Sequence, residues 1–472
     1  MYIEQLYTNC LAEAAYYIES DGEAAIVDPI RETEAYIQMA ASRGAQIKYV
    51  LETHIHADFV SGHIDLAAAT GAEIVFGPGA ETGYAIHGAQ DGELLHVGKI
   101  TLEVLHTPGH TLESTCYLLR DESGKAHSIF TGDTLFVGDV GRPDLLSGNV
   151  TKEALAAMMY DSLRTKISPL PDDLLIYPAH GPGSACGKNI GKETWSTLGK
   201  QKETNYALQD MTRDEFVAKL TQGLAAPPQY YFKDAAINKR GYEALSNVMS
   251  RNMHGLSLEE FMSRAVGGDP AALIIDARNP NDFGDGYIPN SINIGLEDKY
   301  AWWAGTLISI STPLLIIAPV GKEEESVRRL ARIGYENVLG FLEGGFETYV
   351  KSGKPIETVD ALEPEEFAEL ITSGSHGAAQ ILDVRNPGEY ANGHIDGALF
   401  IPLGSLEERV GELDPSKEEE YLIHCGGGYR SMIAASILRR HKFENVTNVR
   451  GGFSKIKGLI PEMIVSEEAV TV

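Results

Sequence analysis

The sequence predicts an α/β protein in two parts: a β-rich N-terminal half and a C-terminal half built from a repeated strand–helix unit. In the first part, short β-rich runs alternate with turns, and histidines and aspartates follow the ends of several runs. In the second, strands alternate with helices, and residues 274–294 match residues 381–401 at a constant offset of 107. Such alternation is typical of mostly parallel sheets. We expect one domain over residues 1–250 and two copies of an α/β unit over 251–357 and 358–472.

Composition is that of a folded chain and excludes some partners. The 472 residues are 43% hydrophobic and 22% charged, which suits about three domains. The net charge of −28 argues against a nucleic-acid partner. The sequence has no apolar run of 18 residues and no signal-peptide pattern, so we expect no membrane partner. Four scattered cysteines, Cys10, Cys116, Cys186 and Cys425, do not form a disulfide framework, so we expect a reducing, cytoplasmic setting.

Several local patterns place polar residues at strand ends. "YYIESDGEAAIVDP" predicts two strands around an Asp-Gly turn, and "TEAYIQMAASRG" predicts a helix ended by glycine. "IKYVLET" predicts a buried strand that leads into His54, and "LLIYPAH" predicts another that ends at His180. Loops held by a sheet are where sites are usually built.

Six of these residues have the chemistry of a metal site. Two imidazoles and one carboxylate with open positions opposite are the ligands of non-haem Fe(II) enzymes that bind O₂. A hydrolytic zinc site accepts the same groups, so ligand chemistry alone leaves both metals open. The six candidates, in chain order, are His54, His56, Asp58, His110, Asp133 and His180.

The order of these motifs resembles that of the metallo-β-lactamase superfamily, His-x-His-x-Asp-His, then His, Asp and His, over residues 1 to about 245. The resemblance implies an αββα sandwich. In two-metal members the first metal takes three histidines, and the second takes the aspartate, the histidine after it and the last histidine. Phe59 stands here in place of that following histidine and offers no lone pair. The resemblance with this departure implies one metal.

Within the superfamily, "THIHADFVSGH", "HTPGHTLES", "TGDTLFVGDVGRPDL" and "LLIYPAHGPGSACG" resemble the persulfide dioxygenases. The resemblance implies one Fe(II) per chain, with zinc possible in purified protein, and oxidation of a persulfide RSSH by O₂ to sulfite and RSH. The implied ligands are His54, His110 and Asp133. His56, Asp58 and His180 would then orient the ligands or hydrogen-bond to bound water.

Three further residues of this half are candidates for substrate contacts. Arg142, in "GRPD", and Tyr177, in "IYPAH", match positions where the family meets its substrate, and an arginine suits an anionic persulfide. Cys186 follows His180 on a glycine-rich loop. It would relay a sulfane sulfur only if it were partly exposed and had a lowered pKa; otherwise it is an inert buried thiol.

The second repeat contains a cysteine loop, "HCGGGYRSM". Cys425 follows a buried strand, and Gly426, Gly427 and Gly428 allow backbone N–H groups to point inward at a helix N-terminus, which stabilises a thiolate. The loop resembles the rhodanese pattern Cys-x-x-Gly-x-Arg, with Tyr429 before Arg430, whereas Cdc25-like phosphatases need a longer Cys-x5-Arg ring. "DVRNPGEYANGHIDGA" resembles the other rhodanese signature. Cys425 and Arg430 are therefore the expected catalytic pair of a sulfurtransferase.

The first repeat lacks this chemistry. The offset places Ala318 at the position of Cys425 and Glu323 at that of Arg430, and only Gly321 remains of the glycines. We expect a rhodanese-homology domain with a structural role in docking or dimerisation, with Trp302 and Trp303 as candidate contacts or core residues.

Together these features favour a persulfide dioxygenase fused to a rhodanese, acting in sulfide detoxification. Its small-molecule partners would be a persulfide, O₂, sulfite and thiosulfate, and we expect a homo-oligomer, either a dimer or a tetramer. The alternative is a zinc thioesterase of the glyoxalase II type with a rhodanese attached. A non-enzymatic sulfur carrier or sensor is disfavoured because the ligand and nucleophile sets are complete.

Overall fold

The computed structural model describes residues 1–145, 150–224, 226–267, 271–297, 299–414 and 420–466. The chain forms two compact units. The first comprises Met1–Met249 together with Ala331–Tyr335, and the second comprises Ser250–Leu330 and Glu336–Val472.

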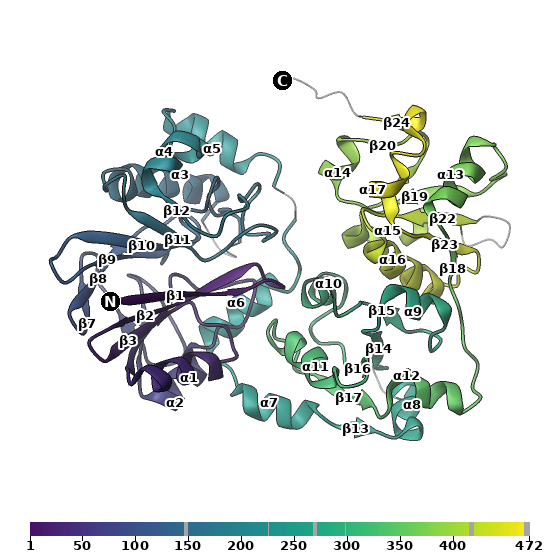
Figure 1. Cartoon of the computed structure of the whole chain (residues 1–472), viewed down its shortest axis with the longest axis horizontal. Coiled ribbons are helices and arrows are strands. Elements are labelled where there is room, and N and C mark those ends of the chain that lie inside the picture. The colour runs from purple at the N-terminus through teal and green to yellow at the C-terminus, as the bar shows by residue number, and fades with distance from the viewer. Residues whose placement is uncertain (146–149, 225, 268–270, 298, 415–419, 467–472) are drawn as a thin grey trace. The chain divides into compact units, whose positions relative to one another are not determined.

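The first unit contains two six-stranded sheets, both visible in Figure 1. The first sheet has strand order β1-β2-β3-β4-β5-β6, antiparallel from β1 to β3 and parallel from β3 to β6. The predicted hairpin is present, with its turn at Asp21 and Gly22 between β2 and β3. The strands are β1 (Tyr2–Thr8), β2 (Glu13–Ser20), β3 (Glu23–Val27), β4 (Gln46–Leu51), β5 (Glu73–Phe76) and β6 (His87–Gly88).

The second sheet has strand order β12-β11-β10-β9-β8-β7. Only β10 and β11 run parallel within it. Apolar side chains from both sheets, such as Tyr16, Val75, Tyr117 and Phe130, form the core between them. The strands are β7 (Leu94–Val97), β8 (Ile100–His106), β9 (Thr115–Arg120), β10 (Ala126–Gly132), β11 (Leu175–Pro178) and β12 (Ser196–Thr197).

Helices cover the outer face of each sheet. Tyr36 of α1 and Leu66 of α2 pack against the first sheet, and Met159 of α3 and Phe216 of α5 pack against the second. The predicted αββα sandwich is therefore confirmed. The helices of this half are α1 (Glu34–Arg43), α2 (His63–Thr70), α3 (Lys152–Ser162), α4 (Leu198–Thr204), α5 (Arg213–Thr221), α6 (Tyr231–Arg240) and α7 (Leu245–Asn252).

The second unit contains two parallel five-stranded sheets of the same topology, with orders β13-β17-β16-β14-β15 and β18-β23-β22-β19-β21. The predicted repeat is thus confirmed as two mostly parallel α/β units. The first repeat's strands are β13 (Gly255–Leu256), β14 (Leu273–Asp276), β15 (Ile292–Asn293), β16 (Leu314–Ile317) and β17 (Val338–Leu342). The second repeat's strands are β18 (Asp360–Leu362), β19 (Gln380–Asp383), β21 (Leu399–Phe400), β22 (Tyr421–His424) and β23 (Val446–Val449), and β20 (His394–Ile395) pairs separately with β24 (Ile464–Val465).

Helices flank both sheets of this unit. In the first repeat they are α8 (Leu258–Gly267), α9 (Pro280–Asp285), α10 (Tyr300–Leu307), α11 (Glu323–Ala331) and α12 (Gly345–Lys351). In the second they are α13 (Pro364–Thr372), α14 (Pro387–Ala391), α15 (Leu406–Arg409), α16 (Tyr429–Arg440) and α17 (Gly452–Ile456). Within the described ranges, none of the helices combines the length and apolar character needed to cross a bilayer.

Candidate metal centre and cysteine loop

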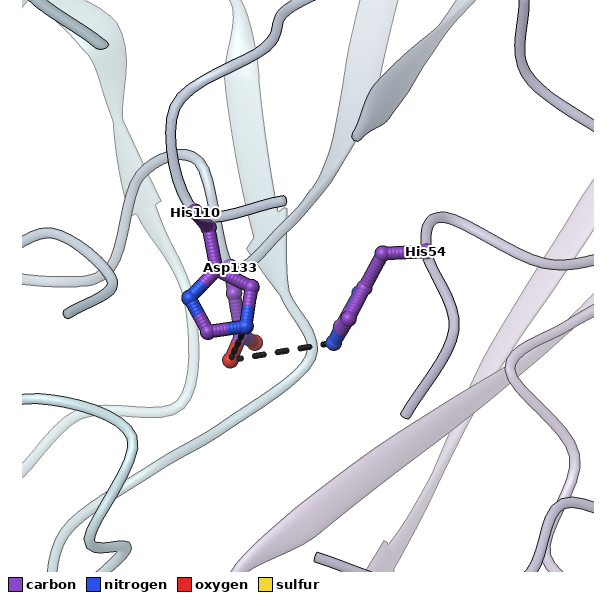
Figure 2. Close-up of side chains that lie close together, drawn as sticks. All are labelled: His54, His110 and Asp133. Carbon is purple, nitrogen blue, oxygen red and sulfur yellow. Dashed lines mark ion pairs between the residues drawn. The ribbon is translucent and has the colours of Figure 1, made fainter. Parts of the chain in front are cut away.

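Three buried ligand atoms converge between the loops that follow β4, β8 and β10. Asp133 Oδ2 lies 3.4 Å from His110 Nε2 and 3.9 Å from His54 Nε2. Figure 2 shows the two rings and the carboxylate directed toward one point. Asp133 Oδ2 is buried and has no hydrogen-bond partner among the described residues, which suits an atom reserved for a cation. The structure thus brings together the three ligands expected from the sequence.

Hydrogen bonds fix His54 in the tautomer that a metal requires. Thr53 Oγ1 donates to Asp28 Oδ2 at 2.7 Å, so the hydroxyl oxygen accepts from His54 Nδ1 at 3.0 Å. Nε2 is then left with its lone pair facing Asp133. Burial, followed by the neighbouring His56, holds the pKa of His54 well below its ordinary value. His54 is accordingly a neutral ligand.

His110 is held in the same way by a backbone carbonyl. Its Nδ1 donates to the carbonyl oxygen of Arg142 at 2.8 Å, so Nε2 faces Asp133 with a free lone pair. Burial opposes ionisation of Asp133, but His180, His110 and His54 outweigh burial and hold the pKa of its carboxyl below the ordinary value. Two neutral imidazoles and one carboxylate are the donor set of a divalent cation, so the residues present fit a metal.

His180 and Asp58 lie directly behind Asp133. His180 Nδ1 is 2.8 Å from Asp133 Oδ1, and His180 Nε2 is 2.8 Å from Asp58 Oδ2. Burial lowers the pKa of His180, but the two carboxylates more than reverse this and raise it well above the ordinary value. In this arrangement His180 fixes the carboxylate plane of Asp133, in keeping with the orienting role implied by the sequence.

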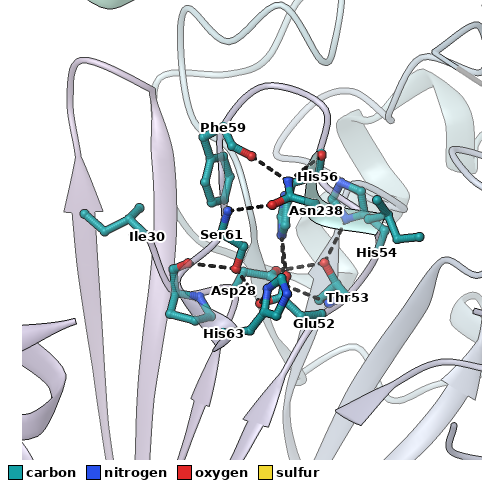
Figure 3. A network of polar contacts seen from close by, with 12 residues as sticks. Asp28, Ile30, Glu52, Thr53, His54, His56, Phe59, Ser61, His63 and Asn238 are labelled. Carbon is teal, nitrogen blue, oxygen red and sulfur yellow. Dashed lines mark hydrogen bonds and ion pairs between the residues drawn. The ribbon is translucent and has the colours of Figure 1, made fainter. Parts of the chain in front are cut away.

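His56, by contrast, is directed away from the cluster. Its Nε2 lies 3.1 Å from Asp28 Oδ1 and 3.5 Å from Glu52 Oε2, and its ring packs on Phe59 with centroids 4.4 Å apart. Figure 3 shows this buried network. Burial lowers the pKa of His56, but Asp28 and Glu52 outweigh burial and raise it to about 9. Because its Nε2 faces these two carboxylates, His56 is not among the ligand atoms that converge on Asp133.

A side chain from α6 fixes the loop that carries the motif. Asn238 Nδ2 donates to the carbonyl oxygens of His56 at 2.8 Å and Phe59 at 2.7 Å, while Asn238 Oδ1 accepts from Ser61 N at 3.0 Å. The sequence pattern pointed to neither Asn238 nor Asp28. A signal for Asp28 is its place before proline at a strand end, where it adopts φ 48°, a conformation that aspartate tolerates better than most residues. We find no comparable signal for Asn238.

The three expected substrate contacts have different surroundings. Arg142 is buried and makes a two-pronged ion pair with Asp144, with distances of 2.7 and 2.8 Å. Its backbone N–H also donates to the carbonyl of Cys186 at 2.8 Å. Arg142 therefore connects His110 to the loop of Cys186, and its contact with substrate stays a prediction.

Tyr177 is half-buried and packs against the sandwich core. Its ring stacks on Phe130 with centroids 5.5 Å apart and lies 5.3 Å from that of Tyr16. Burial raises the pKa of its phenol. Its place is that of a packing residue, and a substrate role for Tyr177 also stays a prediction.

Cys186 does not have the features that a sulfur relay requires. It is 1% exposed, and burial, followed by Asp58 and Asp133, raises the pKa of its thiol well above the ordinary value. The relay role needed a partly exposed thiol with a lowered pKa, whereas the Cys186 thiol is buried and its pKa is raised.

The cysteine loop of the second repeat joins β22 to α16. Gly428 N donates to Cys425 Sγ at 3.1 Å, and Ser431 Oγ lies 3.6 Å from the same sulfur. Phe453 N donates to the Cys425 carbonyl at 2.6 Å. A Cβ at Gly452 would lie 2.4 Å from that carbonyl oxygen, which explains the second glycine of the "RGGF" segment. One backbone N–H and one hydroxyl therefore contact the sulfur, and the "RGGF" segment packs closely against the loop backbone.

Arg430 is positioned by a residue that the sequence did not single out. Its guanidinium makes two hydrogen bonds with Glu389 of α14, at 2.6 and 2.7 Å. A Cβ at Gly426 would lie 2.9 Å from Arg430 Nη2, so the glycine gives the guanidinium room beside the loop. Gly427 and Tyr429 complete the loop, and the Tyr429 phenol donates to the carbonyl of Gly295 at 2.7 Å.

The first repeat retains the fold of the second, but a carboxylate of its own loop accepts the hydrogen bond from the loop's N–H group. Gly321 N, at the position of Gly428, donates to Glu323 Oε1 at 3.2 Å instead of to a sulfur. Glu323 thus occupies an N–H group that the second repeat offers to Cys425. Ala318 is buried, as is Trp303, whose ring lies edge-on to that of Trp302.

Comparison with known proteins agrees with this division. Residues 8–180 match the family model described as Metallo-beta-lactamase superfamily, and residues 257–352 and 363–459 match that of the Rhodanese-like domain. A hydroxyacylglutathione hydrolase of Polaromonas is 33% identical over 256 residues, which are 48% of this chain and 93% of the relative. The chain belongs to the metallo-β-lactamase superfamily.

Other members of the superfamily extend the comparison. The human protein named Persulfide dioxygenase ETHE1, mitochondrial, is 35% identical over 162 residues, which are 34% of this chain. The matched part spans only 59% of that protein and 60% of a Schizosaccharomyces pombe hydroxyacylglutathione hydrolase. A crystal structure of a metallo-beta-lactamase from Staphylococcus aureus is 34% identical, with a TM-score of 0.64, and covers 72% of this chain and 98% of its own. This chain is thus a metallo-β-lactamase domain followed by two rhodanese-like domains, as the sequence predicted.

Proposed function

We propose that the chain is a mononuclear iron persulfide dioxygenase fused to a sulfurtransferase. The observation that carries the proposal is the composition of the metal cluster. It contains His54, His110 and Asp133, while His56 is held by Asp28 and Glu52. A two-histidine, one-carboxylate set is typical of ferrous enzymes that use O₂. In the two-metal hydrolases of the superfamily, the histidine equivalent to His56 is a ligand as well.

The overall reaction balances as RSSH + O₂ + H₂O → RSH + H₂SO₃, in which the terminal sulfur is oxidised and O₂ is reduced. His54, His110 and Asp133 would hold a ferrous ion, which would supply open positions and redox chemistry for the activation of O₂. His180 keeps Asp133 in plane, and the Asp28–Thr53 pair and the Arg142 carbonyl keep both imidazoles in the ligand tautomer. Burial of these groups excludes bulk water from the cluster.

The second repeat would use the product of the first domain. Cys425 takes a sulfane sulfur from a persulfide, forming a cysteine persulfide and releasing the thiol. Sulfite then attacks the outer sulfur, the S–S bond breaks, and thiosulfate leaves with Cys425 restored as thiolate. The N–H of Gly428, which donates to Cys425 Sγ, would stabilise the anionic sulfur, and the Arg430 guanidinium, which Glu389 holds, would bind the sulfite. Persulfide, O₂, sulfite and thiosulfate are therefore the proposed small-molecule partners.

One second candidate, a zinc thioesterase, has support from the comparisons. Hydroxyacylglutathione hydrolases are 33–34% identical to this chain, as close as the persulfide dioxygenases. The direction of His56 disfavours this candidate.

A parallel assay of the full chain separates the two activities. Protein loaded with Fe(II) without oxygen is given glutathione persulfide while O₂ is recorded, and protein loaded with Zn(II) is given a glutathione thioester. We expect O₂ uptake in the first assay and no thioester cleavage in the second. Thioester cleavage by the zinc form without O₂ uptake by the iron form would overturn the proposal.

A further inference from the structure

A short segment of the first rhodanese repeat belongs to the unit that holds the metal centre. Ala331–Tyr335 group with Met1–Met249, whereas the residues on both sides of this segment belong to the second unit. The segment lies inside the rhodanese-like match of residues 257–352 and begins at the last residue of α11. Ala331, Ile333 and Tyr335 are each no more than 1% exposed. Five residues of the repeat that lacks a nucleophile are therefore a buried part of the first unit.

The segment bonds directly to the loop that carries the metal motif. Val60 N donates to the backbone carbonyl oxygen of Arg332 at 2.7 Å. On either side of Val60, the Phe59 carbonyl and the Ser61 N–H bond to Asn238, as Figure 3 shows. Val60 is fully buried, and a buried N–H group requires an acceptor. Arg332 supplies that acceptor.

The side chain of Arg332 anchors the segment in this position. Its Nε donates to Glu32 Oε1 at 2.6 Å, and its Nη1 donates to Cys10 Sγ at 3.0 Å. Both side chains of the Arg332–Glu32 pair are mostly buried, so the pair is held more firmly than an ion pair on the surface. A second arginine, Arg31, donates to the carbonyl of Ala331 at 2.8 Å. Two consecutive residues of the segment are thus fixed to the first unit.

The loop that Arg332 supports is connected to the metal ligands through Asp58, two residues before Val60. Asp58 Oδ2 lies 2.8 Å from His180 Nε2, and His180 Nδ1 lies 2.8 Å from Asp133 Oδ1. A shift of the loop would therefore move Asp58 away from His180 and release the carboxylate plane of Asp133. Residues that orient metal ligands in this way affect metal affinity although they do not touch the metal.

We propose that Arg332 is a positioning residue for the metal centre and acts through the loop of Asp58 and Val60. The rhodanese-like repeat without a cysteine thus contributes to metal binding, a role beyond the docking or dimerisation expected from its sequence. The proposal rests on the metal site of the proposed function, and it holds whichever reaction the metal performs.

The affinity of the full chain for Co(II), measured by competition with a coloured chelator, tests the proposal. Arg332→Ala removes the ion pair with Glu32, whereas the control Arg328→Ala removes a more exposed ion pair with Glu324, four residues earlier in the chain. We expect about tenfold weaker binding in Arg332→Ala and an affinity like that of the wild type in Arg328→Ala. Arg332→Lys keeps a cation beside Glu32 and should recover most of the affinity.

The visible spectrum of bound Co(II) provides a second readout, because it reports the geometry of the ligands and is insensitive to a uniform loss of stability. At saturating cobalt, the spectrum of Arg332→Ala should differ from that of the wild type, and the spectrum of Arg328→Ala should not. An affinity and spectrum of Arg332→Ala equal to those of the wild type would overturn the proposal, as would an equal loss of affinity in Arg328→Ala.

Glu32→Gln weakens the same ion pair from its other side and decides the matter if Arg332→Ala does not fold. It should also bind Co(II) more weakly than the wild type, and an unchanged affinity would overturn the proposal. Failure of the dioxygenase proposal alone has a different signature. In that case the iron form of the wild type would take up no O₂, while the dependence of cobalt affinity on Arg332 would remain.

Discussion

The phenol of Tyr429 donates a 2.7 Å hydrogen bond to the carbonyl of Gly295, and this bond joins the cysteine loop of the second rhodanese repeat to the first repeat. A Cβ at Gly295 would lie 3.2 Å from the Tyr429 ring, so the contact is a close one. Tyr429 is the first residue of α16 and lies between the glycines and Arg430. The first repeat, which has no nucleophile, therefore supports the loop that has one.

Tyr429→Phe should slow sulfur transfer without affecting persulfide oxidation. Loss of the hydrogen bond removes about 1 kcal/mol of loop stabilisation, which corresponds to about a fivefold lower kcat/KM for transfer from thiosulfate to cyanide. Tyr349→Phe is the matched control, because its phenol donates to the Pro355 carbonyl within the first repeat, at 2.8 Å. Equal transfer rates in the two variants would contradict this role for Tyr429.

His424 should make the second repeat sensitive to acid. Burial, only partly opposed by Asp383, lowers the pKa of His424 to about 4. The ordinary histidine pKa in the unfolded chain is about 6.5, so below this pH the unfolded chain binds a proton at His424 that the folded chain does not bind. The free energy of unfolding is therefore unaffected by His424 above about pH 6.5 and falls as the pH drops below that value. The expected loss is about 2 kcal/mol at pH 5.

The first repeat supplies the matched variant for this test, since Ile317 occupies the position equivalent to His424. In calorimetric scans at pH 7 and pH 5, the transition of the second unit should move to lower temperature in the wild type and much less in His424→Ile. An equal shift in both proteins would show that other groups cause the acid sensitivity.

Asp28→Asn should weaken metal binding although Asp28 is not a ligand. An amide N–H facing Thr53 Oγ1 turns the hydroxyl toward His54 Nδ1 as a donor, which moves the imidazole proton to Nε2 and removes the ligand lone pair. Losses of this kind cost about 10–100-fold in metal affinity. Competition with a coloured chelator measures the affinity for Fe(II).

Thr53→Ser keeps the hydroxyl and should bind iron about as well as the wild type. Asparagine tolerates the φ of 48° found at position 28, so the backbone does not explain a loss in Asp28→Asn. Unchanged iron affinity in Asp28→Asn would contradict the tautomer argument.

The constant offset predicted the repeat, and the resemblance of the motif order to the metallo-β-lactamase superfamily implied the sandwich and the ligands His54, His110 and Asp133. The sequence did not predict which residues hold these ligands and their loops in place. Asn238 bonds to the His56 carbonyl across 182 residues, and no local pattern indicates such a pairing. The direction of His56 depends on Asp28 and Glu52, which the motif does not include.

The sequence also did not predict how deeply individual side chains are buried. A glycine-rich loop predicts exposure, yet the segment with Cys186 is held by Ser184 and Arg142 with its thiol inside. Likewise, the alternation in "LLIYPAH" does not show that Tyr177 stacks on Phe130 of the neighbouring strand.

Product analysis by mass spectrometry tests the central claim, that one chain oxidises a persulfide and then transfers sulfur to the sulfite formed. The Fe(II)-loaded full chain and its Cys425→Ser variant are each given glutathione persulfide and O₂. We expect thiosulfate as the main product of the wild type, and sulfite with little thiosulfate from the variant at similar O₂ consumption. No sulfite or thiosulfate from either protein, with iron bound, would contradict the account.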